Sequence, residues 1–167
     1  MAIELGDVQS NVLRGYRGAL PHVAYAFLAL PETEQARAFV RDTVPLTTSC
    51  SAFDRLAGAA GDERFIWNLG FTFAGMRALG ANARDFERDA AFALGPAERA
   101  EALGDRGASA PEAWEAVYRA PDLHAVVSLS AWAPDGIARG QAKLDALLAR
   151  HPRVRRLGQE TGDALPG

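Results

Sequence analysis

Few side chains in this sequence could carry out chemistry, and they lie far apart. Imidazole rings can ligate a metal or haem iron and can transfer protons near neutral pH, and the chain has three of them, in His22, His124 and His151. A metal site needs further ligands at a fixed spacing, and the sequence contains neither a His-Glu-x-x-His motif nor paired cysteines. We therefore expect structural or solvent-exposed roles for the three histidines, and no metal-ligating residue is predicted.

Nucleophilic and phosphate-binding groups lead to the same expectation. Cys50, the only cysteine, lies in a Thr-Thr-Ser-Cys-Ser segment without an evident basic neighbour, so a reactive thiolate is not expected there. A single cysteine also excludes an internal disulfide and a cysteine-based zinc site. The glycines of segments 15–18 and 58–61 lack the spacing of a phosphate-binding loop. The residues alone therefore predict no catalytic and no cofactor-binding set.

The charged residues are typical of a solvated surface. Between positions 84 and 106 carboxylates alternate with arginines, which indicates helix faces exposed to water. A small basic run, Arg153, Arg155 and Arg156, is interpreted as protection of an edge strand against aggregation, with an anion site as the alternative. The net charge of −3 argues against a nucleic-acid-binding protein, for which a strongly basic balance is expected.

Length and composition favour one soluble globular domain that spans residues 1–167. The chain is 49% apolar and 23% charged, and its length is sufficient for a substantial core. A membrane helix needs a run of about 20 apolar residues, and the longest apolar run, 23–30, is far shorter. The N-terminus shows no secretory signal. We expect a cytoplasmic location, with Tat-type export carried by a partner as the alternative.

The elements that must position these side chains begin with a strand at 22–30, apolar on both faces and therefore central in its sheet. A helix is predicted over 33–44, followed by a loop over 46–62 with room for one short helical turn. Residues 64–71 alternate as a half-buried strand does. Thr72 can cap a short helix directly behind this strand, and Gly80 suits the left-handed residue past its end.

The second half of the chain continues the same alternation of helices and strands. Short helical pieces are predicted over 83–92 and 96–103, then a turn-rich excursion over 103–115 and a strand at 124–132. Asp135 can cap a helix that runs to about Arg150, and 154–161 has the polarity of an edge strand. This order predicts a ferredoxin-like α+β fold, an antiparallel sheet of about four strands with helices on one face. In that topology His22 and His124 begin neighbouring strands, so we expect that they could approach each other.

Three segments of distinctive composition follow one another along the chain. They are Asp7-Val-Gln-Ser-Asn-Val-Leu-Arg-Gly-Tyr16, Trp67-Asn-Leu-Gly-Phe-Thr-Phe-Ala-Gly-Met-Arg-Ala-Leu-Gly80 and Leu103-Gly-Asp-Arg-Gly-Ala-Ser-Ala-Pro-Glu-Ala-Trp-Glu115. Together they resemble the N-terminal half of the dye-decolourising (DyP-type) haem peroxidases. The stretch His124–Trp132 resembles the third sheet strand of that half. The resemblance covers nearly the whole chain.

This resemblance implies a ferredoxin-like half of a dimeric α+β barrel, whose sheet packs against the sheet of a second half. Proteins of the family use hydrogen peroxide to oxidise haem iron and then take electrons from dyes or phenols. A distal Asp in a Gly-x-x-Asp-Gly motif and an Arg handle the peroxide, and a His of the second half ligates the iron. A carboxylate that shuttles a proton, a cation that stabilises charge and an axial ligand that tunes the iron fit this chemistry.

The sequence departs from the family pattern at its catalytic motif. The only Asp-Gly pair is Asp135-Gly136, in the segment Trp-Ala-Pro-Asp-Gly, and we interpret it as a helix cap. No histidine has the context of the proximal ligand. The family's catalytic, haem-binding and metal-ligating residues therefore have no counterpart among these residues, and we expect that haem is not bound by this chain alone.

Our preferred hypothesis is an N-terminal domain or fragment of a DyP-type peroxidase, inactive alone, whose partner is the missing C-terminal half or a second copy of itself. Its uncovered sheet face should expose an apolar patch of roughly several hundred Å², which predicts self-association. The alternative is a stand-alone homodimeric binding domain, with a small-molecule pocket between the sheet and residues 103–115. A third hypothesis is a haem enzyme that uses His22 or His124 as its ligand.

Overall fold

The computed structural model describes residues 3–16, 20–31 and 33–164. Within these ranges the chain alternates helices and strands, with the longer helices between strands. The strands are β1 (His22–Ala29), β2 (Phe65–Phe71), β3 (Ala125–Ala131) and β4 (Arg155–Asp163); the α-helices are α1 (Ser10–Leu13), α2 (Thr33–Thr43), α3 (Cys50–Ala57), α4 (Phe73–Ala78), α5 (Ala90–Glu98), α6 (Ala100–Leu103) and α7 (Pro134–Arg150); the 3₁₀ turns are η1 (Val44–Leu46), η2 (Ala83–Phe86), η3 (Gly107–Ser109), η4 (Pro111–Ala113) and η5 (Ala116–Arg119).

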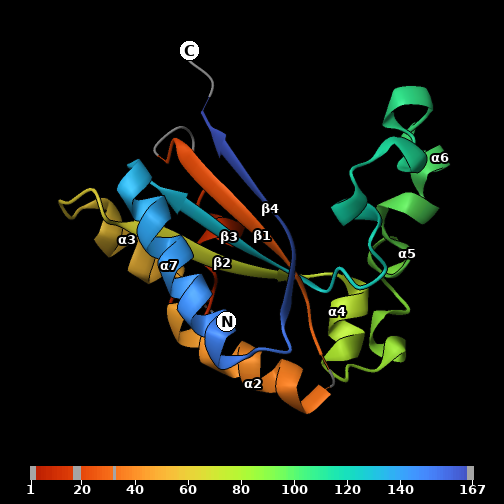
Figure 1. Ribbon diagram of the computed structural model, residues 1–167, viewed down its shortest axis with the longest axis horizontal. Coiled ribbons are helices and arrows are strands. Elements are labelled where there is room, and N and C mark those ends of the chain that lie inside the picture. The colour runs from red at the N-terminus through yellow and green to blue at the C-terminus, as the bar shows by residue number, and fades with distance from the viewer. Residues whose placement is uncertain (1–2, 17–19, 32, 165–167) are drawn as a thin grey trace.

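The four strands of the described residues form one antiparallel sheet in the order β2-β3-β1-β4 (Figure 1). The central position of β1 and the edge position of β4 confirm the interpretation of their sequence patterns. Because β1 and β3 run antiparallel, Val23 pairs with Ser130 and Phe27 with Val126. The crossing order and the helices between strands confirm the predicted ferredoxin-like arrangement.

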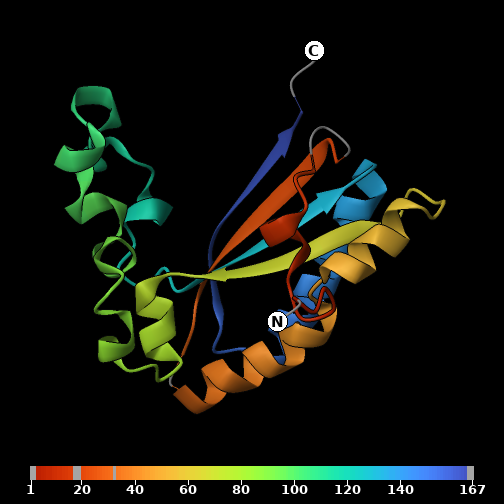
Figure 2. The same ribbon diagram turned by 180° about the vertical axis from the view of Figure 1, so that it is seen from behind.

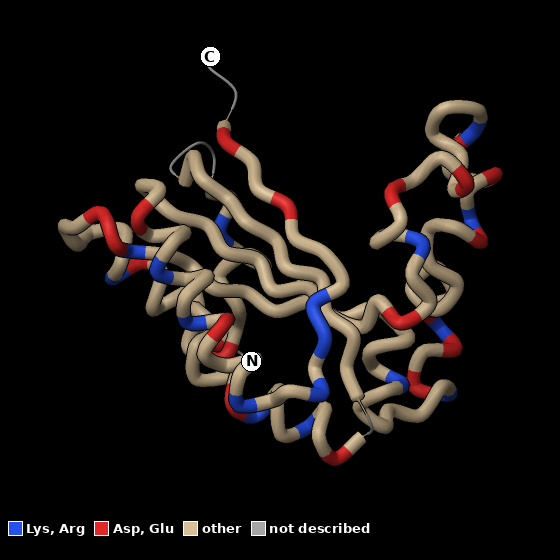
Figure 3. The backbone as a smooth tube through the Cα atoms, in the orientation of Figure 1, with Lys and Arg blue, Asp and Glu red and all other residues tan. Residues whose placement is uncertain are grey.

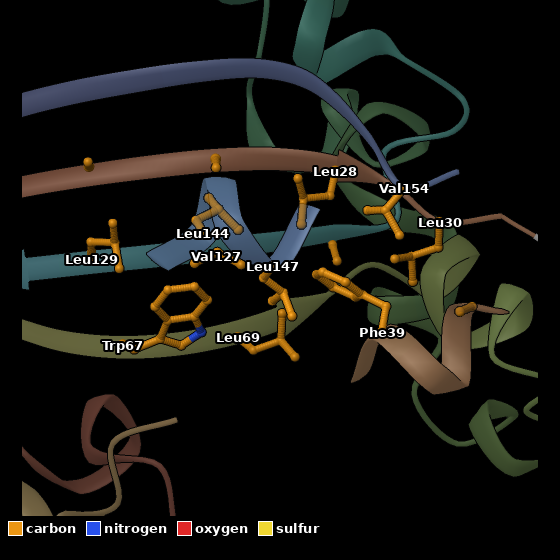
Figure 4. Close-up of a cluster of buried hydrophobic side chains, with 14 residues drawn as sticks. Leu28, Leu30, Phe39, Trp67, Leu69, Val127, Leu129, Leu144, Leu147 and Val154 are labelled. Carbon is orange, nitrogen blue, oxygen red and sulfur yellow. The ribbon is translucent and has the colours of Figure 1, made fainter. Parts of the chain in front are cut away.

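The main core lies between one face of this sheet and the helices α2 and α7 (Figure 4). Alternate strand residues point into it, because successive side chains of a strand face opposite sides. Trp67 is wholly buried there, and Phe39 of α2 and Leu144 of α7 pack into the same cluster. The indole Nε1 of Trp67 is buried without a hydrogen-bond partner among the described residues.

Charge follows these layers closely (Figure 3). The strands β1, β2 and β3 contain no Lys, Arg, Asp or Glu, whereas β4 at the edge carries several charged residues. Polar edge strands resist pairing with other chains. Within the described ranges, none of the helices combines the length and the apolar character needed to cross a bilayer.

A long excursion separates β2 from β3. Residues 83–119, from η2 to η5, form a limb that stands beside the sheet and that we call the arm (Figures 1 and 2). The helix α4 lies at its base. No residue from Met76 to His124 is buried, although the segment contains several aromatic side chains. The arm therefore has no closed core of its own.

Several local expectations are confirmed and others are wrong. The Thr72 hydroxyl accepts a hydrogen bond from the Gly75 amide, as a helix cap does, and Gly80 has a positive φ of 85°. The loop expected over 46–62, with room for one short helical turn, contains the longer helix α3, whose N-terminus the Ser49 side chain caps. Asp135 does not cap α7, whose N-cap is Ala133. The Asp135 carboxylate lies in the first turn, where its negative charge interacts favourably with the positive end of the helix dipole.

Candidate functional site

The second face of the sheet is only partly covered, and we call it the open face. It carries the strand residues that alternate with the core positions, and Tyr25 near its middle is 39% exposed. The neighbouring positions on β3 are small and polar, whereas the flanking positions on β1 are apolar. The open-face residues of the two central strands are Val23, Tyr25, Phe27, Val126, Ser128 and Ser130.

The N-terminal segment covers one border of the open face, above β2. Asn68 is 2% exposed there and lies in a closed triangle of side-chain hydrogen bonds with Ser10 and Tyr16. The Tyr16 hydroxyl donates to the Asn68 amide oxygen at 2.9 Å. Burial raises the pKa of the Tyr16 phenol above its usual value. This triangle satisfies a polar group that would otherwise be buried without partners.

The same N-terminal segment protects the edge of β2. The side chain of Gln9 donates to the carbonyl of Leu69 at 2.9 Å and accepts from its amide at 2.8 Å, as a neighbouring strand would. The Arg14 guanidinium forms two hydrogen bonds with Asp54 of α3, which hold the pKa of that carboxyl below its usual range. The β2 edge is therefore closed to an incoming strand along this stretch.

The arm touches the open face at its other border, through η5. The ring of Tyr118 packs edge-on against Phe27 of β1, with centroids 5.3 Å apart. Its hydroxyl donates to the Glu160 carboxylate of β4 at 2.7 Å, and this bond, together with burial, raises the pKa of Tyr118 to about 12. Gly158 allows the approach, because a Cβ there would lie 3.2 Å from the Val117 side chain. The sequence carried no periodic signal for this contact.

A hollow of about 940 Å³ lies between α4, α5 and the returning segment 113–123. Its walls are mainly aromatic and aliphatic, and they include one arginine and one glutamate. The alternative of a homodimeric binding domain predicted a pocket between the sheet and residues 103–115, but no strand residue lines this hollow. The lining residues are Thr72, Phe73, Ala74, Ala91, Phe92, Ala93, Leu94, Gly95, Pro96, Arg99, Ala113, Trp114, Glu115, Tyr118, Ala120, Pro121 and Leu123.

The base of the hollow is fixed by a close approach of two backbones. The Thr72 hydroxyl donates to the carbonyl of Leu123 at 2.7 Å, and the Thr72 amide donates to the carbonyl of His124 at 3.1 Å. Gly75 lies directly against His124, where a Cβ would overlap the carbonyl group. The helix α4 can sit in this position only because residue 75 has no side chain.

The three histidines do not come together. His22 pairs with Ala131 at one end of the sheet, whereas the amide of His124 bonds to Leu28 near the other end. The expectation that these two residues could approach each other is therefore wrong. Both begin strands, but neighbouring antiparallel strands begin at opposite ends of a sheet.

Each histidine ring has a partner within the fold. The His22 Nδ1 lies 2.6 Å from an Asp163 oxygen, and the His151 Nε2 lies 3.0 Å from Asp42. The His124 Nδ1 accepts from the Leu30 amide at 2.9 Å. Among the described residues, no group of three His, Cys, Asp or Glu side chains is arranged to hold a metal ion.

The remaining candidates also have structural partners. Cys50 is buried, with its sulfur 3.5 Å from the Gln9 carbonyl oxygen. Two residues of the basic run form ion pairs, Arg155 with Asp122 and Arg156 with Asp145. The run does lie on an edge strand, and the paired guanidinium groups leave little of it for an anion site.

Within the described residues, the hollow offers no free His, Cys, Met or Tyr side chain as an axial ligand for haem iron. The hollow is large enough for part of a porphyrin, but no histidine, cysteine or methionine lines it, and the hydroxyl of its one tyrosine, Tyr118, is already bonded to Glu160. The smaller cavity beside His151, of about 250 Å³, is too small for a macrocycle. The candidate site therefore consists of an aromatic-walled hollow and an open sheet face.

Comparison with known proteins gives a consistent result. The family model of the DyP dimeric α+β barrel domain matches residues 7–164. An ancestral D-type dye-decolourising peroxidase superposes with a TM-score of 0.83 at 24% identity. The aligned region covers 100% of this chain and 36% of the peroxidase chain. No curated protein sequence matches the chain.

Two further solved structures show the same fold at lower identity. A decolourising peroxidase from Auricularia auricula-judae has a TM-score of 0.78 at 20% identity, with coverage of 99% of this chain and 34% of that one. A dye-decolourising peroxidase in complex with 2,6-dimethoxyphenol gives the same TM-score and identity, with coverage of 99% and 35%. The chain thus spans about a third of the length of the solved structures it matches.

Proposed function

Because the chain belongs to the dye-decolourising (DyP) peroxidase family, through its dimeric α+β barrel domain, we propose that it forms one half of a peroxidase barrel. Its open sheet face packs against the sheet of a second α+β unit. That unit comes from the same polypeptide or from another chain. The pair together performs the haem-dependent oxidation of dyes and phenols by hydrogen peroxide that is typical of the family.

The observation that carries this proposal is the contrast between the two faces of the sheet. One face is sealed by α2 and α7, and its side chains are buried. The other exposes Tyr25 at its centre, although the strands there carry no charged residue apart from those of β4. A face of uncharged strands that is sealed only at its borders suits packing against a second sheet, at the usual spacing of about 10 Å.

The division of labour follows from the residues that this half lacks. When bound, haem supplies the redox chemistry, and its iron needs an axial ligand and a distal acid. No histidine of this chain faces the open sheet or the hollow with a free ring. This half then acts as a wall of the barrel that orders the second unit and excludes water, while the second unit holds the iron.

The experiment that tests this proposal is a titration of the purified chain with hemin, followed in the Soret region. We expect weak absorbance that rises without saturation, and no peroxide-dependent oxidation of 2,6-dimethoxyphenol. A saturable band at a stoichiometry of about one haem per chain would contradict the proposal. His22→Ala and His124→Ala would then identify the ligand.

The rival function, a homodimeric binding domain, is favoured by the same open face. Two copies could bury it against each other around a two-fold axis, since a two-fold interface uses the same patch on both chains. Light scattering after size-exclusion chromatography separates the two ideas. A concentration-independent dimer that Tyr25→Glu dissociates would favour the homodimer, and Leu103→Glu in the arm is the matched control.

A further inference from the structure

The hollow beside the arm has a mainly apolar lining, although no residue of the arm is buried. We propose that this hollow is a binding site for uncharged aromatic compounds of two or three rings that carry one hydrogen-bonding group. The inference concerns the chain alone. Only the idea that such a compound then serves as an electron donor rests on the proposed function.

The size and the walls of the hollow suit a flat aromatic molecule. Its volume of about 940 Å³ lies within the range of typical small-molecule sites, about 300–1,000 Å³. Phe73 and Phe92 meet edge to face with centroids 6.1 Å apart, and Trp114 and Tyr118 line the hollow from the returning segment. Rings that meet at such angles offer both faces and edges for stacking against a further ring.

Three uncharged wall side chains already use their polar atoms within the fold. The Trp114 Nε1 donates to the Ser109 carbonyl at 2.8 Å, the Tyr118 hydroxyl donates to Glu160, and the Thr72 hydroxyl donates to Leu123. The wall rings therefore present mainly apolar surface to a ligand. An apolar ligand that covers this surface removes it from contact with water, which favours binding.

Two charged residues remain, and they set the charge of the ligand. Arg99 and Glu115 are the charged members of the lining, and neither forms an ion pair within the described part of the chain. Their opposite charges cancel, so the site has no net preference for an anion or a cation. They can still donate to and accept from a hydroxyl, amine or ether group of a neutral ligand.

The hollow has no filling from the arm itself. The arm lacks buried residues, and Leu94, which belongs to the lining, is 55% exposed. A ligand that covers Leu94 and the ring faces would give the arm the core that its own side chains do not provide.

The test compares two dyes that share one ring system and differ in charge. N-phenyl-1-naphthylamine is neutral, and 8-anilinonaphthalene-1-sulfonate adds a sulfonate. We expect saturable fluorescence with the neutral dye at about one site per chain, with energy transfer from tryptophan that Trp114→Phe reduces. The anionic dye should bind at least about 10-fold more weakly, because its sulfonate loses water without gaining a net opposite charge in the site.

Two matched variants separate this site from general stickiness. Leu94→Glu places a charge in the lining, and we expect it to weaken the neutral dye at least about 10-fold. Leu103→Glu changes a leucine of similar exposure, 49%, in the same arm but outside the lining, and should leave binding unchanged. Both positions are about half-exposed, so both variants should fold, which the far-UV circular dichroism spectrum checks.

The proposal is overturned by any of three results. These are a signal that does not saturate, equal loss in the Leu94 and Leu103 variants, or tighter binding of the anionic dye. The hemin titration of the barrel proposal reads a different property, the iron ligand. The failure of one experiment therefore leaves the other interpretable.

Discussion

Replacing Gly75 by alanine should destabilise the protein, because α4 packs directly against the backbone of His124. A Cβ at position 75 would overlap the His124 carbonyl oxygen, and it would lie 2.7 Å from the carbonyl carbon and 3.1 Å from the Cα. Ordinary contacts begin at about 3.4 Å. Even the carbonyl carbon would therefore have to move by about 0.7 Å, and the nearer carbonyl oxygen by more.

His124 is fixed on both sides, so this movement has a cost. Its amide donates to Leu28 at 2.9 Å, and its carbonyl accepts from the Thr72 amide at 3.1 Å. Overpacking of this kind costs about 1–3 kcal/mol or more, and a weakened backbone hydrogen bond adds about 1 kcal/mol. The higher helix propensity of alanine offsets about 1 kcal/mol of this destabilisation. The last two terms cancel, so the net expectation is a loss of about 1–3 kcal/mol or more in the free energy of unfolding.

Urea unfolding followed by far-UV circular dichroism measures this loss, and Gly58→Ala is the control. Gly58 lies at the end of α3 with φ −84° and ψ −7°, and the nearest atoms to a Cβ there are 3.9 Å away. Alanine fits this conformation, so the control should change stability by less than about 1 kcal/mol, in the stabilising direction. If both variants unfold at the same urea concentration as the wild type, the backbone contact does not fix α4 and the reasoning is refuted.

Two further predictions concern side-chain hydrogen bonds. The absorbance difference at 295 nm between the wild type and Tyr118→Phe should titrate near pH 12, and Glu160→Gln should lower the pKa of Tyr118. The pKa of Tyr118 in the folded state is raised above the unfolded value of about 10. The hydrogen bond therefore stabilises the fold below about pH 10, and this stabilisation is lost as the pH rises through 12. A titration near pH 10 in the wild type would contradict the hydrogen bond. Asn68→Ala should reduce the free energy of unfolding by about 1–3 kcal/mol in urea, since the Ser10 and Tyr16 hydroxyls lose a buried partner, and a loss as small as that of Asn82→Ala at the exposed η2 cap would show that the triangle is not stabilising.

Much of the fold could be predicted because its signals are local. The strand β2, the cap at Thr72 and the stop at Gly80 each depend on neighbouring residues, and all three are confirmed. The expectation that β2 is only half-buried is wrong, because Ile66 and Asn68 on its second face are buried as well. The prediction for 46–62 was a loop with room for one short helical turn, whereas α3 spans eight residues, Cys50–Ala57. Ser49 supplies a cap there, but its partner amide is identified only once the helix has formed.

The candidate site was much less accessible from the sequence. The Gly95-Pro96 break was visible, and the structure shows it as a kink with φ 72° at Gly95. That this kinked helix faces Trp114 and Tyr118 across a hollow was not visible, because no periodicity links the outgoing and returning passes of the arm. The side chains of the lining are ordinary apolar residues that would equally suit a closed core.

The sequence by itself determined the order of the elements, the central place of β1 and the family resemblance, because these depend on patterns along the chain. Only the tertiary structure decided which residues meet. It separated His22 from His124, since antiparallel neighbours begin at opposite ends of a sheet. It also joined Tyr118 to Glu160 and left the arm without a core. Such contacts depend on how distant segments pack, and a glycine such as Gly75 shows its role only when the backbone opposite it is in place.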